Sequence, residues 1–224
     1  MAKIIHYELN RLERRLLRMA ALVEESVLKA VRCCHDVDKD MADDVIASDI
    51  ELDRQEVFIE EEALKVLALY QPVAGDLRFI VAVLKINGDL ERIGDLAVTI
   101  AKSVKHMGEI PGVVLSESLD TIADHAVRLL RGSLDAFTKQ DAASAKQLLA
   151  KAPELAAMHR GVINDVSQAF KDHPGSMETL ISVLLVCRAL ERVADHAGNI
   201  AEDVVYMLQG TIIRHMDERE IERS

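Results

Sequence analysis

The sequence predicts an all-α protein made of two pseudo-symmetric three-helix bundles, with six long helices in all. Apolar residues recur at spacings of three and four along most of the chain, which is the period of an amphipathic helix. The chain contains 10 glycines and 4 prolines, too few for the many turns of an all-β sandwich. The motif LERxxD occurs twice, at 90–95 and at 190–195, so the second half repeats the first.

The residues around this motif support an internal duplication. When 90–101 is aligned with 190–201, seven of the twelve positions are identical. Composition alone predicts about one identity in a window of this length. Pro72 and Pro174 precede the two motifs at nearly the same distance, which predicts the same order of helices and breaks in both halves.

Three helices are expected in the first half, over residues 4–35, 40–69 and 73–106. The first carries a continuous apolar stripe that includes Leu9, Leu12 and Leu16. DVDKD, from residue 36, supplies capping residues and a turn. YQPVAGD, from residue 70, breaks the chain again, and its Pro72 suits the start of the next helix, where the missing N–H is not needed.

The second half repeats this order, with helices expected over residues 114–138, 141–171 and 177–209. MGEIPG at 107–112 contains two glycines and a proline and is the best boundary between the repeats. We therefore expect one three-helix domain at 1–108 and a second at 109–210, followed by a charged C-terminal tail at 211–224.

The net charge of −11 limits the partners that the protein can bind. An acidic surface repels phosphate backbones, so nucleic acid is not expected, whereas cations, including metal ions, are favoured. The N-terminus lacks the apolar run of a signal peptide, and no segment reaches the ~20 apolar residues of a membrane span. Membrane contact is therefore expected only through partners. Cys33, Cys34 and Cys187 form no CxxC pair and are expected to be reduced, semi-buried thiols of a cytosolic protein.

Acidic residues four positions apart occur on the second and third helices. Glu91 and Asp95 lie on successive turns beside the buried stripe of the third helix, and Asp49 and Asp53 are spaced likewise on the second. Asp53 precedes Pro72 by the same interval at which Glu91 follows it, and Asp49 and Asp95 are likewise equidistant from this proline. If the two helices pack antiparallel, the four carboxylates lie at one height, as a site for a hard metal ion requires.

The second repeat carries only part of this pattern. Glu191 and Asp195 repeat the acidic pair on the last helix, but counting back from Pro174 by the same two intervals reaches Leu155 and Lys151. Pro153 lies in the same segment and is expected to kink the helix or to start a new one. A second, equivalent metal site is therefore doubtful.

Each acidic pair also has a structural interpretation. Acids at this spacing are common on solvated helix faces, and Arg54 and Arg92 are placed to neutralise them. His196, next to Asp195, is a candidate metal ligand, but a structural role is the more common one for such a histidine. His125 is expected to be a surface or packing histidine.

Three segments of the sequence resemble the PhoU family of phosphate-uptake regulators. They are LKINGDLERIGDLAVTIAK at 84–102, QPVAGDLR at 71–78 and LERVADHAGNIAEDVVYMLQG at 190–210. The resemblance implies a cytoplasmic, non-enzymatic regulator that acts with the Pst phosphate ABC transporter, on its ATPase side, and with the sensor kinase PhoR. Such a protein restrains phosphate uptake and the phosphate-starvation response when phosphate is plentiful. The expected assemblies include a homodimer.

The resemblance also implies metal binding. The E/DxxxD motifs of the family bind clusters of iron, zinc or related ions, and here they match Asp49 with Asp53, Glu91 with Asp95, and Glu191 with Asp195. The family motif on the fifth helix is not matched, because Lys151 and Leu155 occupy its positions. We therefore expect divalent or trivalent metal ions at the first repeat, and a second site only in part.

Two other functions remain open at this point. A carboxylate-bridged metal-storage protein or metalloenzyme would use helix acids, but the spacing after Glu91 and Glu191 is xxxD, whereas ferritin-like sites use ExxH. A histidine phosphotransfer module would use His125 or His196, although neither has the neighbouring lysine expected there. No P-loop, HExxH or GxSxG motif is present.

Overall fold

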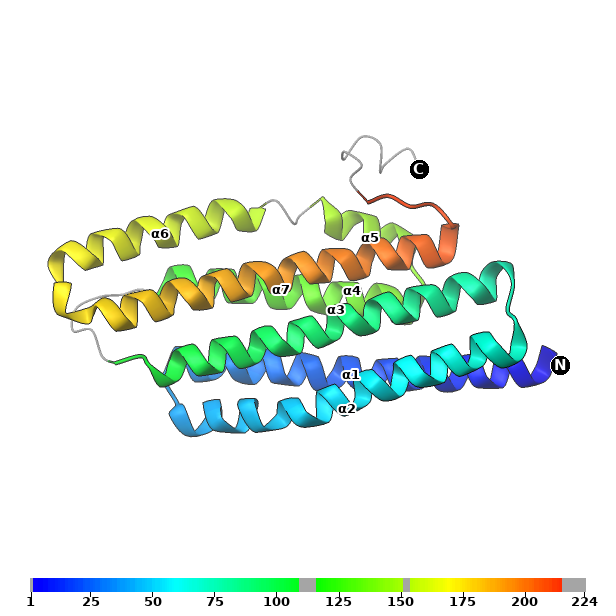
Figure 1. The fold of residues 1–224 in the computed structure, drawn as a ribbon. Helices are drawn as coiled ribbons and strands as arrows, with labels where there is room; N and C mark the ends of the chain where they lie inside the picture. Colours follow the sequence, from blue (N-terminus) through cyan, green and yellow to red (C-terminus); the bar gives the residue numbers. More distant parts are fainter. Residues whose placement is uncertain (1, 109–115, 151–153, 215–224) are drawn as a thin grey trace.

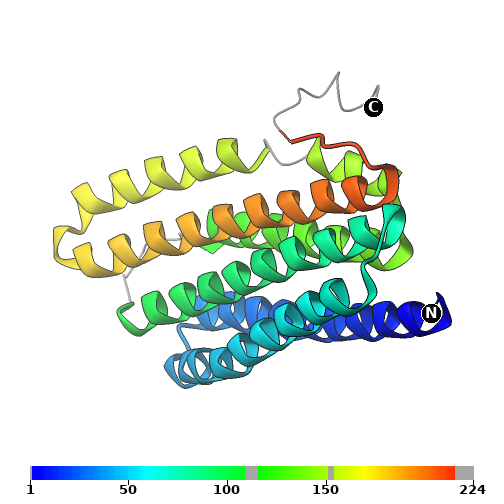
Figure 2. The same cartoon turned by 45° about the vertical axis from the view of Figure 1, so that its right-hand side comes forward.

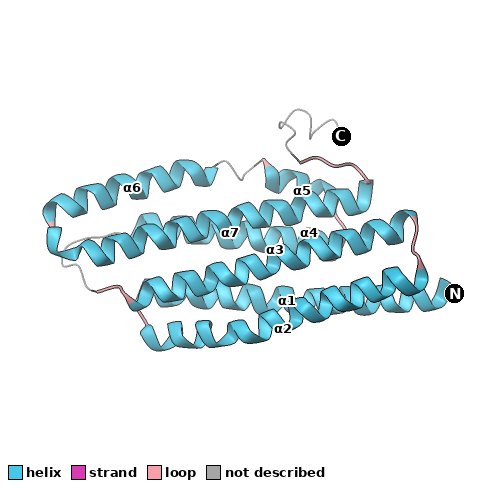
Figure 3. Ribbon diagram, viewed as in Figure 1, coloured by secondary structure: helices cyan, strands magenta, loops and turns pink. Residues whose placement is uncertain are grey.

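The computed structural model describes residues 2–108, 116–150 and 154–214. Within these ranges the chain is almost entirely helical and contains no strand, as Figure 3 shows. The helices are α1 (Ala2–Asp36), α2 (Lys39–Tyr70), α3 (Ala74–Lys105), α4 (Ser116–Lys139), α5 (Ala142–Leu149), α6 (Glu154–Asp172) and α7 (Met177–Gln209), with a 3₁₀ turn, η1 (Pro174–Ser176), before α7. The prediction of an all-α protein is confirmed.

The first repeat is an antiparallel bundle of α1, α2 and α3, drawn from blue to green in Figure 1. Asp38 ends the first connection by accepting hydrogen bonds from the backbone N–H groups of Asp40 (3.1 Å) and Met41 (2.9 Å). These bonds satisfy two donors that have no partner inside α2. Gln71, with φ 47°, ends α2 in the left-handed conformation, and the chain then reverses into α3.

The second repeat has one helix more than expected among the described residues. The helix predicted over 141–171 is interrupted, because α5 ends at Leu149 and α6 begins at Glu154. This is the break expected from Pro153, whose ring cannot continue a helix without a clash; residues 151–153 themselves lie outside the described ranges. The other predicted helices agree closely with the observed ones, with ends that differ by two residues at most.

Two predicted segments fall partly outside the described residues. The boundary at 107–112 is described only as far as 108, and the tail at 211–224 only as far as 214. In the described residues, none of the helices has an apolar stretch long enough to cross a membrane.

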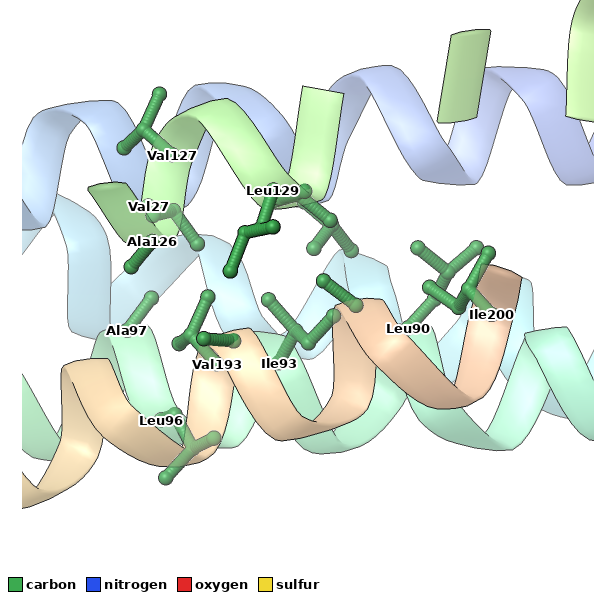
Figure 4. Packing of buried hydrophobic residues seen from close by; sticks show 14 of the residues in the cluster. Val27, Leu90, Ile93, Leu96, Ala97, Ala126, Val127, Leu129, Val193 and Ile200 are labelled. Carbon is green, nitrogen blue, oxygen red and sulfur yellow. The ribbon is translucent and has the colours of Figure 1, made fainter. Parts of the chain in front are cut away.

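The two repeats share one core, centred on α3 and α7. These helices lie side by side in both views of the molecule (Figures 1 and 2) and make the most extensive helix–helix contact. Figure 4 shows Ile93 of α3 and Val193 of α7 facing Leu129 of α4. Val27 of α1 lies in the same cluster. Apolar side chains from both repeats therefore form a single continuous interior.

The three cysteines are free thiols inside this core. Burial raises the pKa of Cys33 to about 11, and it raises the pKa values of Cys34 and Cys187 to about 12. At neutral pH they are protonated packing residues. Reduced thiols were expected, but all three are buried, whereas the sequence predicted semi-buried ones.

Candidate metal centre

Carboxylates of α2 and α3 meet on one surface of the first repeat, which we call the acidic shelf. It is formed by Asp49 and Asp53 of α2 and by Glu91 and Asp95 of α3. Burial raises the pKa of Asp49, and the charges of Asp53 and Asp95 raise it further. The pKa of Glu91 is raised by burial, then by Asp95, and also by Glu56 and Asp53 across the helix interface. Acids of α2 and α3 therefore raise each other's pKa values across the helix interface, in the register expected from their distances to Pro72.

Close packing of α2 on α3 holds the shelf together. A Cβ atom built at Gly94 would lie 2.9 Å from Leu52 Cδ1 and 3.9 Å from Asp49 Oδ1. Leu52 is buried between the acids Asp49 and Asp53, so its side chain fixes the face that α2 presents. Only a glycine leaves room for this approach without moving Leu52.

One arginine neutralises part of the shelf. Arg92 contacts Glu91 through Nε (3.3 Å) and Asp95 through a terminal nitrogen (3.2 Å). Arg54 instead lies 3.8 Å from Glu51, outside the shelf. Of the two arginines considered from the sequence, Arg92 is therefore the counter-ion. The charge of Lys102 also lowers the pKa of Asp49, against the effect of burial.

The side chains of the shelf are not arranged as a finished coordination sphere. Across the described residues, no three side chains of His, Cys, Asp or Glu are grouped closely enough to hold a metal ion. Four carboxylates on adjacent helix turns supply the oxygen donors that hard cations use. Gathering them on one ion requires rotation of the side chains and release of Arg92 from Glu91 and Asp95.

The acidic pair of the second repeat has a different environment. Glu191 lies 3.1 Å from Nδ1 of His159 on α6, and it accepts a hydrogen bond from Arg188 of its own helix. Burial, and then the charge of Glu191, raise the pKa of Asp195. Lys151 lies outside the described residues, and the side chain of Leu155 is not described. A histidine from α6 therefore stands opposite Glu191, where the first repeat places the acids of α2.

His159 was missed in the sequence because its spacing matches no motif. Along the chain it lies slightly closer to Pro174 than Glu191 does, so it falls outside the register that places acids opposite each other in the first repeat. A search for any ligand-type side chain near that register, instead of acids at the two exact intervals, would have found it.

The two histidines considered for phosphotransfer have structural environments. His196 Nδ1 donates to Asp89 Oδ1 (2.7 Å), and Asn199 Nδ2 donates to the same oxygen (3.1 Å). These bonds join α3 to α7, so His196 links the repeats. His125 is only 6% exposed and is not presented to a partner.

Two helical repeats that share one core, with carboxylates on the surface, define an all-α protein with an internal repeat. The sequence pattern of the PhoU domain matches this chain twice, over residues 16–104 and 116–204. The chain belongs to the PhoU family, as its sequence motifs predicted.

Related proteins match over nearly the whole chain. A Pseudomonas putida protein named phosphate-specific transport system accessory protein PhoU homolog is 35% identical, covering 93% of this chain and 82% of its own length. The PhoU of Serratia marcescens, named phosphate-specific transport system accessory protein, is 29% identical, covering 96% of this chain and 89% of its own. The crystal structure of PhoU from Pseudomonas aeruginosa has a TM-score of 0.87 at 32% identity, covering 92% of this chain and 99% of that one. These matches confirm the predicted fold.

Proposed function

We propose that this protein is an accessory regulator of phosphate transport. The observation that carries the proposal is the double PhoU match along a chain that covers most of the length of relatives named as accessory proteins of the phosphate-specific transport system. The continuous core supports a rigid scaffold, since α3 and α7 hold both repeats in one unit. On this proposal the chain acts by contact with partners and has no catalytic reaction of its own.

The finer role is that of an adaptor in the cytoplasm. The protein contacts the ATPase side of the Pst phosphate transporter and a PhoR-type sensor kinase, and it holds the phosphate-starvation response off when phosphate is plentiful. The acidic surface suits this role, because a net charge of −11 discourages contact with nucleic acid and favours cationic patches on proteins.

Deletion of the gene tests the regulatory proposal. With phosphate in excess, the deletion strain is expected to express alkaline phosphatase, and a plasmid that carries the intact gene restores repression. Unchanged repression in the deletion strain would contradict the proposal. A plasmid with a nonsense codon early in the gene is the matched control for the restored strain.

We also propose that the acidic shelf binds metal ions such as iron or zinc. Support comes from the level positions of Asp49, Asp53, Glu91 and Asp95, and from the raised pKa values of Asp49 and Glu91, whose charges a cation would offset. Glu191 and Asp195 are a weaker candidate, because Lys151 and Leu155 occupy the positions at which the first repeat carries its second pair of acids.

Elemental analysis after loading with iron or zinc tests the shelf. The variant Glu91→Ala/Asp95→Ala is expected to lose most of the bound metal. The control Asp124→Ala/Asp135→Ala removes two carboxylates from α4 and is expected to keep it. The variant Glu191→Ala/Asp195→Ala is expected to lose less than the shelf variant. Equal metal content in the wild type and the shelf variant would remove the shelf as the site.

A further inference from the structure

The outward face of α2 carries a row of exposed side chains, which we call the α2 stripe. It consists of Ile50, Arg54, Val57, Glu61 and Leu64, spaced by threes and fours along the helix. The three apolar members recur every seventh residue, so they share one face of the helix, and they are 59%, 51% and 52% exposed in chain order. Isolated exposed apolar residues are ordinary, but a periodic row of them on one helix face indicates a contact surface.

The other sides of α2 are occupied by the helices of its own repeat. On one side, Glu62 forms an ion pair with Arg11 of α1. On another side, Leu52 is buried against α3 at Gly94. Figures 1 and 2 both show α2 along the lower edge of the molecule. The α2 stripe therefore points away from the bundle, where another molecule can reach it.

The two charged members of the stripe alternate with the apolar ones. Arg54 lies between Ile50 and Val57, and Glu61 lies between Val57 and Leu64. Neither charge is strongly paired along α2: the contact of Arg54 with Glu51 is 3.8 Å long, and the side chain of Arg54 is 73% exposed. The stripe therefore presents the order apolar, positive, apolar, negative, apolar.

This order is complementary to itself when it is read in the opposite direction. In an antiparallel pair of α2 helices, Arg54 of each copy faces Glu61 of the other. Val57 lies at the two-fold axis, and Ile50 faces Leu64 of the second copy. The intervals are four, three, four and three residues in one direction and three, four, three and four in the other. Facing residues are therefore out of step by one residue at most, or about 1.5 Å along the helix.

We propose that the α2 stripe is the interface of a homodimer in which the α2 helices of two copies pack antiparallel. Such a contact is isologous, because the same patch is used on both copies and each pairing occurs twice. The charges set the direction, since a parallel pair would place Arg54 on Arg54 and Glu61 on Glu61. The proposal assigns a face to the homodimer that the sequence resemblance implied, and it does not rest on the proposed regulatory function.

The same alternation makes other occupants poorer. A basic partner helix would bring positive charge against Arg54, and an acidic one would bring negative charge against Glu61. Insertion into a bilayer would take both charged side chains out of water together with the apolar ones. Interfacial membrane helices instead keep their charges on the opposite face. A second copy satisfies the apolar and the charged members at once.

The dimer is expected to be weak. Asp53 and Glu60 flank the stripe on the side of α3, where they affect the pKa values of Glu91 and Glu56, and pairing brings like charges closer together there. A contact between two single helices is also at the small end of specific interfaces. Dilute solutions are therefore expected to contain mainly monomer, and the dimer is expected to form as the protein concentration rises.

Sedimentation of the purified full chain at increasing concentration tests the proposal by a charge swap. Arg54→Glu or Glu61→Arg places like charges opposite each other, and each is expected to weaken dimerisation at least about tenfold. In Arg54→Glu/Glu61→Arg, opposite charges face each other again, so dimerisation is expected to return. The matched control is Arg160→Glu, which makes the same change in net charge at an exposed position of α6 and is expected to dimerise like the wild type.

Mixing the two single variants provides a sharper measurement. The Arg54→Glu chain carries two acids on its stripe and the Glu61→Arg chain carries two bases, so each repels its own copy and attracts the other. An equimolar mixture is expected to form a heterodimer at concentrations at which either variant alone is monomeric. Heterodimer formation also shows that both variants are folded.

A disulfide cross-link reports the register of the two helices. Val57→Cys brings two thiols close to the two-fold axis, and mild oxidation is expected to join two chains. Ile163→Cys, on α6, is 43% exposed in the wild type and serves as the control, which is expected to remain monomeric. Cys33, Cys34 and Cys187 do not compete, because all three are buried.

Several results would overturn the proposal. A wild type that remains monomeric at about 1 mM would do so, as would a dimer that Arg54→Glu weakens no more than Arg160→Glu does. Failure of the double variant or of the mixture to associate, or absence of the Val57→Cys cross-link, would equally contradict the antiparallel pairing. A monomeric wild type that binds purified transporter, and loses this binding in Val57→Ser/Leu64→Ser, would assign the stripe to a different protein. None of these measurements depends on alkaline phosphatase repression, so failure of this proposal and failure of the proposed function are distinguishable.

Discussion

Asp49 and Glu91 are carboxylates that folding makes harder to ionise. Burial is the main cause of the raised pKa of each, and neighbouring acids add to it. A pKa that is higher in the folded state than in the unfolded state means that the folded state binds the proton more tightly. The associated stability is fully present below the unfolded pKa and is lost as the pH rises through the folded pKa. At neutral pH, therefore, the ionised shelf lowers the stability of the metal-free fold.

The first prediction follows from this sign. Asp49→Asn/Glu91→Gln is expected to melt at a higher temperature than the wild type at pH 7 in the presence of a chelator. The difference is expected to shrink as the pH is lowered into the range where the wild-type carboxylates take up protons. Melting followed by circular dichroism at several pH values provides the measurement. Asp44→Asn/Glu61→Gln changes the net charge equally at exposed sites of α2, away from the shelf. A lower melting temperature than wild type at pH 7 would contradict the argument.

The residues of the shelf were predictable, but their pairing was not. Counting from Pro72 placed Asp49, Asp53, Glu91 and Asp95 at one height, because helix rise is nearly constant. The choice of Arg92 over Arg54 as counter-ion depends on side-chain rotamers, which spacing does not determine. The contact of His159 with Glu191 could not be predicted, because it depends on how α6 packs on α7. The sequence does not determine that packing, since α6 follows a break in the expected helix.

At the scale of elements, α2 and α3 are fitted to each other at one glycine. Gly94 faces Leu52, whereas Gly88, in the middle of the same helix, has no atom within 4 Å of the position where a Cβ would stand. Glycine within a helix costs roughly 1 kcal/mol relative to alanine. The contact with Leu52 accounts for that loss at Gly94, and nothing in the structure accounts for it at Gly88.

The second prediction uses this contrast. Gly94→Val is expected to lower the free energy of unfolding by about 1–3 kcal/mol, because its side chain overlaps that of Leu52 in a packed interface. Gly88→Val, in the same helix, is expected to be neutral or slightly stabilising. Urea denaturation of both variants measures the difference. Combining Gly94→Val with Leu52→Ala is expected to cost less than the sum of the two single changes. Equal effects of the two valine substitutions would rule out the close contact.

Most element boundaries could be predicted because they depend on local chemistry. Asp38 caps α2, and the segment around Pro72 interrupts the chain, so the helices of the first repeat were found with ends close to the observed ones. The split between α5 and α6 was foreseen as one of two consequences of Pro153, a kink or a new helix. Local pattern could not choose between them, since the outcome depends on how each piece packs on α7.

At the scale of the whole molecule, the repeats in the sequence are not independent bodies. Apolar contacts join them along α3 and α7, and partly buried polar contacts do so as well. Lys85 of α3 lies 2.8 Å from the carboxylate of Asp203 of α7, whose side chain is 3% exposed. His196 and Asn199 of α7 both donate to Asp89 of α3. The duplicated sequence shows how many bundles to expect, but only the structure shows that they form one core.

The last prediction is that the chain unfolds as one unit. Trp reporters at the partly exposed positions Leu22→Trp on α1 and Ile163→Trp on α6 are expected to give coincident urea midpoints, because neither repeat keeps its interior when α3 separates from α7. Adding Lys85→Met leaves the buried Asp203 without its cation and is expected to lower stability by about 1–3 kcal/mol at neutral pH. Both reporters should shift together by the same amount. Two separate midpoints, or a shift confined to the α6 reporter, would mean that the repeats fold independently and that the shared core contributes little to the stability of either.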